Sequence, residues 1–251
     1  MSEPALTLRN PPIVEAVVDI ECDFKPGQNF NALEESARQR FGDHYPKFRP
    51  QFLQELQIEM KGNESLTHSK RQRIQAFQCL KDDEKQLVQV RSTGYSFNRL
   101  APYTSFDDYL PEIRRTWVLY REIASPIQIK VVRVRYINRI RLPFTDGRVE
   151  IDEYFRIGPR LPDEERLTMV GFLNQYVAVE ADTGHQVTTV LTAQQPDKDC
   201  VPIIFDNTAA AMSPVDPEDW ERLEATLGAL RALKNRVFRN TLSDKCLHLF
   251  Q

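Results

Sequence analysis

Residues 13–24 alternate between apolar side chains and a mainly acidic set, and this alternation limits the fold more than any other feature. The apolar positions are Val14, Ala16, Val18, Ile20, Cys22 and Phe24. The acidic positions are Glu15, Asp19, Glu21 and Asp23. Successive side chains of a strand point to opposite faces of a sheet. The period of two therefore predicts a half-buried strand with an acidic, solvated face.

A second strand with the opposite charge is predicted over residues 129–142. Its expected core positions are Val132, Val134, Tyr136, Ile140 and Leu142. Its other face carries Arg133, Arg135, Arg139 and Arg141, together with Val131 and Ile137. The two alternating strands are thus acidic in the first half of the chain and basic in the second.

Similar elements follow each of these strands. After the first strand, the pattern predicts a helix over 30–41, strands over 52–60, 73–80, 86–91 and 95–98, and a helix from Phe106 to Ser125. After the second, it predicts a short helix over 152–155, strands over 167–181, 185–193 and 200–206, and a long helix capped by Asp216 and Pro217. The apolar stripe expected on the long helix is Trp220, Leu223, Leu227, Leu230, Leu233 and Val237.

This order favours an α+β fold over alternating βαβ units. We predict two tandem β-α-β(3-4)-α units, residues 1–125 and 126–251, packed as one globular unit. Their strands would form a continuous antiparallel sheet with helices on one face. The order resembles the TATA-binding-protein-like saddle, in which the first strands of the two units lie side by side.

Composition limits the classes of function. The net charge of −3 gives no general attraction to nucleic acid or anionic membrane, so a basic function needs a local patch. Neither a signal peptide nor a membrane span is expected. The cysteines Cys22, Cys79, Cys200 and Cys246 are far apart and predict reduced, mostly buried thiols in a cytoplasmic protein. No metal site is expected from them, because zinc knuckles use close cysteine pairs.

The opposed charges allow two interpretations. If the strands pair, the row Glu15, Asp19, Glu21 and Asp23 would face the row Arg133, Arg135, Arg139 and Arg141. Opposite charges across strands stabilise a sheet by roughly 0.2–1 kcal/mol per pair, so the rows are first interpreted as a charge ladder. The alternative is that surplus arginines, above all Arg139 or Arg141, bind a phosphate or carboxylate.

An Asn-Arg pair recurs in both halves, as Asn98-Arg99 and Asn138-Arg139. Asparagine is disfavoured in strands. Its repetition indicates a hydrogen bond that fixes a strand end, or one that holds a ligand. Arg133, Arg135, Arg139, Arg141, Asn98, Arg99 and Asn138 are therefore the hypothetical ligand-binding residues.

Four segments resemble a family of sporadically distributed, uncharacterised bacterial proteins of about 250 residues. They are Asn10–Ala16 (NPPIVEA), Phe97–Tyr103 (FNRLAPY), Trp117-x-x-Tyr120 and Tyr136–Ile140 (YINRI). The resemblance implies a prokaryotic cytoplasmic protein without an established activity. The patchy distribution of the family suggests accessory genes of defence or toxin–antitoxin loci, and so a protein partner encoded nearby. It implies no catalytic residue and no cofactor.

Three functions remain as hypotheses. The leading one is a non-enzymatic binding or regulatory protein that acts by protein–protein contact. The second is nucleic-acid or nucleotide binding through the arginine strand. Further basic clusters lie at Lys70, Arg71 and Arg73, and at Arg231, Lys234, Arg236 and Arg239, where a solvated helix face is expected. The third is a divalent-metal-dependent phosphate-processing enzyme that uses Glu21 and Asp23 near Lys25.

Overall fold

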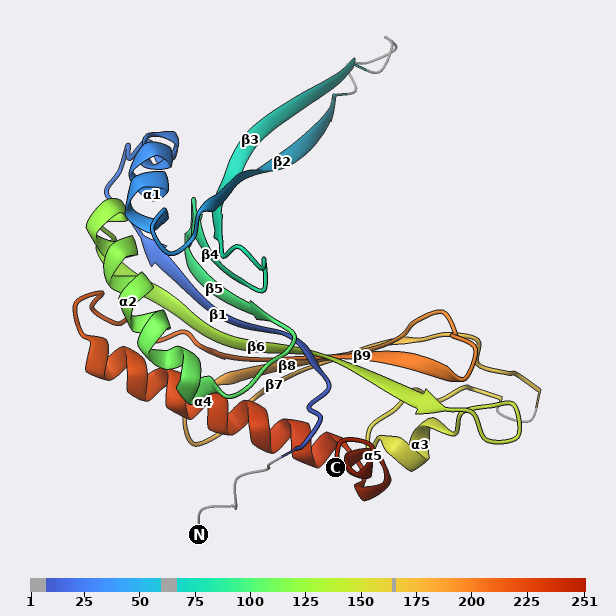
Figure 1. The fold of residues 1–251 in the computed structure, drawn as a ribbon. Coiled ribbons are helices and arrows are strands. Elements are labelled where there is room, and N and C mark those ends of the chain that lie inside the picture. Colours follow the sequence, from blue (N-terminus) through green and yellow to red (C-terminus); the bar gives the residue numbers. More distant parts are fainter. Residues whose placement is uncertain (1–7, 60–66, 164–165) are drawn as a thin grey trace.

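The computed structural model describes residues 8–59, 67–163 and 166–251, except for the side chains of residues 54–72. In this part of the chain the protein has an α+β fold, with nine strands in one antiparallel sheet ordered β2-β3-β4-β5-β1-β6-β9-β8-β7 (Figure 1). The strands are β1 Ile13–Asp23, β2 Lys47–Glu59, β3 Thr67–Leu80, β4 Gln86–Arg91, β5 Gly94–Leu100, β6 Gln128–Pro143, β7 Leu173–Val179, β8 Gln186–Ala193 and β9 Cys200–Ala211. The helices are α1 Leu33–Phe41, α2 Phe106–Ala124, α3 Ile151–Tyr154, α4 Trp220–Thr241 and α5 Asp244–His248, and a 3-10 turn, Phe30–Ala32, precedes α1.

The two alternating strands lie next to each other at the middle of the sheet. β1 pairs with β6 in antiparallel register, and Asp19 stands opposite Arg133. β5 follows on the other side of β1, and β9 on the other side of β6. The first strand of each half of the chain therefore contacts the first strand of the other, an arrangement expected from the order of the elements.

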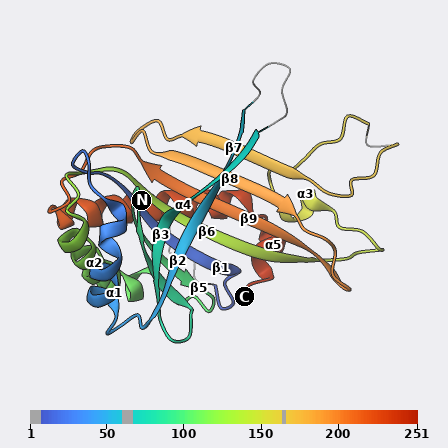
Figure 2. The same ribbon diagram turned by 90° about the horizontal axis from the view of Figure 1, so that it is seen from above.

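α1, α2 and α4 cover one face of the sheet, and no helix among the described residues lies on the other face (Figures 1 and 2). α2 begins where the sequence predicts, because the Ser105 hydroxyl accepts a hydrogen bond from the Asp108 amide at 3.2 Å. The helix ends at Ala124, and the capping residue Ser125, which has a left-handed backbone (φ 45°), precedes Pro126. Trp117 on α2 donates to the carbonyl of Pro217 at 3.2 Å, which ties α2 to the start of α4.

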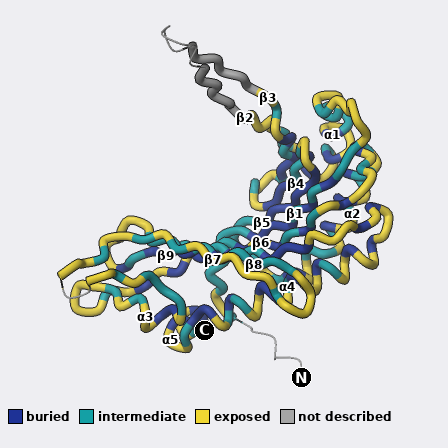
Figure 3. The backbone as a smooth tube through the Cα atoms, turned by 180° about the vertical axis from the view of Figure 1, so that it is seen from behind, coloured by how far each residue is buried: buried dark blue, intermediate teal, exposed yellow. Residues whose placement is uncertain are grey.

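The apolar core lies between the helices and the sheet (Figure 3). The larger cluster joins the even positions of β1 and β6 to the buried faces of α2 and α4. A smaller cluster around Phe155, Phe205 and Phe238 joins α3 and α5 to the end of α4. All four cysteines are buried and unpaired. Among the described residues, no helix is both long enough and apolar enough to cross a membrane.

Several elements differ from the predicted ones at their ends. β9 continues to Ala211, because Asn207 and the alanines after it keep pairing with β6 and β8. The cap of α4 is Asp219, which accepts from the Arg222 amide at 3.0 Å, and Asp216 instead closes the preceding turn. β7 begins at Leu173 and ends at Val179, so it is shorter than the segment 167–181. The short helix α5 was not predicted.

Candidate functional site

The helix-free face of the sheet carries the predicted charge rows. Paired residues of an antiparallel sheet point to the same face. One row therefore crosses the whole sheet, through Arg49, Gln78, Gln89, Ser96, Asp19, Arg133, Ala210, Gln186 and Val179. Figure 2 looks onto this face. It is the surface on which Arg133, Arg135, Arg139 and Arg141 can meet another molecule.

Arg133 is the arginine that joins the two rows. Its guanidinium donates to Asp19 Oδ1 and to Glu21 Oε2, both at 3.1 Å. Asp19 also forms an ion pair with Arg91 of β4, at 2.6 Å. Asp19 is thus held by cations from both sides, and its side chain is only 16% exposed.

Arg135 and Arg141 pair with carboxylates outside the acidic row of β1. The guanidinium of Arg135 binds Asp206 of β9, with Nη2 at 2.5 Å and Nε at 2.9 Å from the carboxylate oxygens. This hydrogen bonding raises the pKa of Arg135. Arg141 donates to Asp197, in the loop before β9, at 3.0 Å. Asp206 and Asp197 thus bind two arginines that were expected to pair with the acidic row of β1.

The strand register explains why the rows do not match residue for residue. β1 begins at Ile13, which stands opposite Asn138. Arg139 and Arg141 therefore lie beyond the end of β1. Both pair with β9, and the Arg139 amide also donates to the carbonyl of Pro12, just before β1, at 2.8 Å. The side chain of Arg139 is exposed, and its charge contributes to lowering the pKa of Asp197, after the Lys198 amide and Arg141.

The other members of the acidic row have partners of their own. Glu15 accepts a hydrogen bond from Asn98 Nδ2 at 2.7 Å. Asp23 forms an ion pair with Lys130 at 3.4 Å. Glu21 and Asp23 thus hold different cations. In the described part of the chain, no group of three or more His, Cys, Asp or Glu side chains is placed to hold a metal ion.

The recurring Asn-Arg pairs do not converge on one site. Asn98 is on the helix-free face, where Ser96 and Gln89 donate to its Oδ1 at 3.0 and 3.2 Å. Asn138 lies on the covered face and donates to the carbonyls of Tyr136 and Phe205. Arg99 donates to the carbonyl of Pro102 at 3.3 Å. Each asparagine thus forms hydrogen bonds with groups of its own strand and of neighbouring strands.

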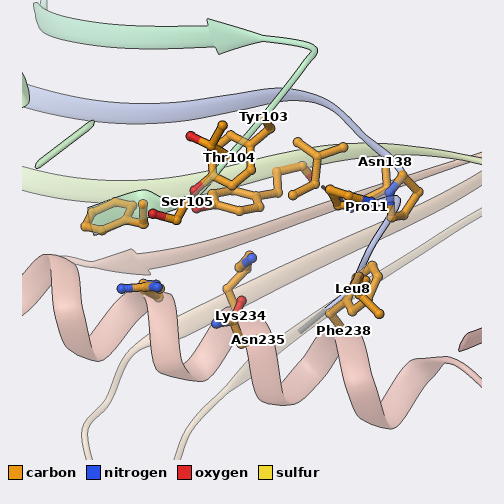
Figure 4. Close-up of a pocket in the computed structure, with 14 residues that line it drawn as sticks. Leu8, Pro11, Tyr103, Thr104, Ser105, Asn138, Lys234, Asn235 and Phe238 are labelled. Atoms are coloured by element: carbon orange, nitrogen blue, oxygen red, sulfur yellow. Dashed lines mark hydrogen bonds between the residues drawn. The ribbon is translucent and has the colours of Figure 1, made fainter. Parts of the chain in front are cut away.

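A pocket of about 290 Å³ lies on the covered face, between α4, β6 and the segment after β5 (Figure 4). The sequence did not predict it. Its lining is Leu8, Pro11, Pro12, Ile13, Tyr103, Thr104, Ser105, Phe106, Tyr136, Asn138, Arg231, Lys234, Asn235 and Phe238. Figure 4 shows Lys234 projecting from α4 toward the Tyr103–Ser105 segment, with Leu8 and Phe238 at the other end.

Lys234 is the unusual residue of this pocket. It is 4% exposed, and its Nζ lies 3.3 Å from the centre of the Tyr136 ring. Across the described residues, its Nζ makes no hydrogen bond and no ion pair. Burial, and secondarily the nearby Arg231 cation, lowers the pKa of this ammonium well below its usual value. The expectation of a solvated cationic face on α4 is therefore wrong at Lys234.

The other polar groups around Lys234 are already bonded. Arg231 forms a two-pronged ion pair with Asp107, at 2.6 and 3.0 Å. The hydroxyls of Tyr103 and Tyr136 share a short hydrogen bond, and burial raises the pKa of Tyr136 to about 12. Asn207 of β9 donates to the carbonyl of Lys234 at 3.0 Å, which fixes this turn of α4 on the sheet.

A signal for the buried lysine does exist in the sequence. Residues 220, 223, 227, 230, 234, 238 and 241 recur at intervals of three and four, and all of them are buried. The helical period therefore places Lys234 on the apolar stripe beside the predicted Leu233. Phe238 is buried at the next turn, where the predicted Val237 is only half-buried against the core. Lys70 and Arg71, from the other basic cluster, lie outside the residues whose side chains the structure describes.

No protein-family model matches the chain, and no curated protein matches it significantly.

Proposed function

We propose that this chain is a non-enzymatic binding protein that recognises a protein partner with the helix-free face of its sheet. The observation that carries the proposal is a row of exposed apolar side chains on β7, an edge strand. Leu173, Val177 and Val179 are 66%, 56% and 65% exposed, and their register places them on the same face as Arg135. Exposed apolar side chains grouped on one face are typical of interaction surfaces.

The charges of this face also favour a protein over a nucleic acid. Nucleic acids bind surfaces with unpaired cations, which replace the counterions of the phosphates. Arg133, Arg135 and Arg141 each hold a carboxylate of the chain itself. A surface of paired charges beside apolar side chains resembles the polar rim and apolar centre of protein interfaces.

We further propose that the two halves are copies of one unit, in a TATA-binding-protein-like saddle. The strand order supports this, because β5-β4-β3 on one side of the central pair corresponds to β9-β8-β7 on the other. The motifs of the uncharacterised bacterial family support a cytoplasmic role as an accessory component of a defence or toxin–antitoxin system. The partner would then be the product of a neighbouring gene.

The test is binding of the purified chain to the purified product of the neighbouring gene, measured by calorimetry. Val177→Lys places a charge in the apolar row and should weaken binding at least about tenfold, which corresponds to about 1.4 kcal/mol. Ile127→Lys is the matched control, because Ile127 is 54% exposed and lies in the turn before β6. It should bind as the unmodified chain does.

Two results would contradict the proposal. One is equal binding by the Val177→Lys variant and the unmodified chain. The other is tight binding of DNA or RNA that falls steeply with salt and is lost in Arg139→Glu, since that pattern belongs to phosphate recognition.

A further inference from the structure

Independently of the helix-free face, we propose that the pocket around Lys234 binds a small organic carboxylate, with the anionic group at the Lys234 amine and an apolar tail toward Leu8 and Phe238. This site lies on the opposite side of the sheet from the proposed partner surface. It therefore adds a ligand to the protein and does not depend on the proposed partner.

The charge of the lining selects an anion. None of the lining residues is acidic, and the two basic ones are Lys234 and Arg231. Arg231 is neutralised by Asp107, which leaves Lys234 as the buried amine that no carboxylate of the described residues satisfies. An unpaired ammonium in an apolar interior is costly, so the carboxylate of a ligand would provide the negatively charged partner that Lys234 lacks among the described residues.

The number of donors favours a carboxylate over a phosphate. A phosphate carries more charge and more acceptor oxygens, and proteins usually bind it with several cations or a row of backbone amides. Here one amine is unpaired, and the neighbouring Tyr103 and Tyr136 hydroxyls bond each other. A single negative charge matches this set.

The apolar lining and the volume of the pocket limit the rest of the ligand. Leu8, Pro11, Pro12, Ile13 and Phe238 form an apolar portion, and Leu8 packs against the cluster that contains Phe238. At about 290 Å³, the pocket lies near the lower end of the roughly 300–1,000 Å³ usual for ligand sites. A short aliphatic or aromatic acid fits these limits.

Binding of such an acid is coupled to a proton. Burial lowers the pKa of the amine in the empty pocket, and an adjacent carboxylate raises it. The protein therefore takes up a proton as the anion binds. Affinity should increase as the pH falls toward the pKa of Lys234 in the empty pocket.

The experiment is calorimetric titration of the full chain with sodium hexanoate and sodium benzoate, compared with hexanamide and hexylamine. The acids should bind at least about tenfold more tightly than the amide or the amine. In mildly alkaline buffers of different ionisation enthalpy, the observed heats should differ by the uptake of up to one proton. Amide NMR shifts should change mainly in residues 103–105 and 231–238.

Lys234→Met removes the amine and keeps the length of the side chain, and should lower the affinity for both acids at least about tenfold. Lys198→Met, at an exposed loop lysine, is the matched control and should leave the affinity unchanged. Absence of binding by both acids would overturn the proposal. Binding that Lys234→Met leaves unchanged, or shifts confined to other parts of the chain, would overturn it as well. The NMR mapping uses the unmodified chain, so it decides the question even if Lys234→Met fails to fold.

Discussion

Arg133 and Asp19 stand opposite each other in the β1–β6 register, and their side chains meet at 3.1 Å. The pair joins the first strand of one half of the chain to the first strand of the other. Arg91 reaches the same carboxylate from β4, although β5 lies between them. The β5 residue opposite both Arg91 and Glu21 is Gly94, which places no side chain in the way.

Gly94→Ala should destabilise the fold by about 2–6 kcal/mol, since overpacking and backbone strain each cost about 1–3 kcal/mol. Gly94 has φ of 151°, and an added Cβ would lie 2.0 Å from the carbonyl oxygen of Ile20. Urea unfolding monitored by circular dichroism measures the change. Gly228→Ala is the control: Gly228 lies in α4 with no atom within 4 Å of an added Cβ, and the change should stabilise the fold by about 0.5–1 kcal/mol. Equal midpoints for the two variants would contradict the assigned packing of Gly94.

Arg135→Ala should lower the free energy of unfolding by about 0.5–1 kcal/mol. It leaves Asp206, whose side chain is 17% exposed, without its two-pronged partner. Arg139→Ala, on the same face of the same strand, should change the stability by less than about 0.5 kcal/mol. A double-mutant cycle with Asp206→Ala isolates the pair. No coupling in that cycle would show that the Arg135–Asp206 contact contributes nothing to stability.

Lys234 should make the protein more stable as the pH rises toward the usual lysine pKa of 10.5. The lowered pKa in the folded state means that the unfolded chain binds the extra proton between the folded pKa and 10.5. The free energy of unfolding therefore increases with pH across this window. Lys234→Met should flatten this part of the curve, whereas Lys198→Met should not. A curve that Lys234→Met leaves unchanged would show that the amine is charged in the folded protein.

The four thiols should react with a disulfide reagent only after unfolding. Cys22, Cys79, Cys200 and Cys246 are 5%, 1%, 5% and 0% exposed. Burial raises the pKa of Cys22, Cys79 and Cys246 to about 12, so the reactive thiolate is scarce at neutral pH. Absorbance of the chromophore that the reagent releases should show negligible reaction in buffer and four equivalents of reacted thiol in urea. Rapid labelling of any one thiol in buffer would contradict its burial.

The local elements were predictable because they depend on neighbours in sequence. The alternation of residues 13–24 matches β1 within one residue, and α2 begins at Phe106 as predicted. Positions 132, 134, 136, 140 and 142 are buried, as the period of two required. The antiparallel sheet and the α+β class follow from these patterns.

The partners of the charges were not predictable, because they depend on strands far apart in the chain. Asp206 pairs with Arg135 because β9 lies beside β6. The end of β1 stands opposite Asn138, so no residue of β1 lies opposite Arg139 or Arg141. The row of four carboxylates and the row of four arginines share one face, yet only Arg133 connects them directly among the described residues.

By itself, the sequence determined which residues form strands and helices and which face of each strand is apolar, since these depend on periods of two and 3.6 residues along the chain. Only the tertiary structure decided where the side chains meet. Packing α4 over β6 turned Lys234 from an expected surface cation into a buried amine in a pocket. Its burial depends on which elements cover that face of α4, and that is a property of the assembled sheet and helices.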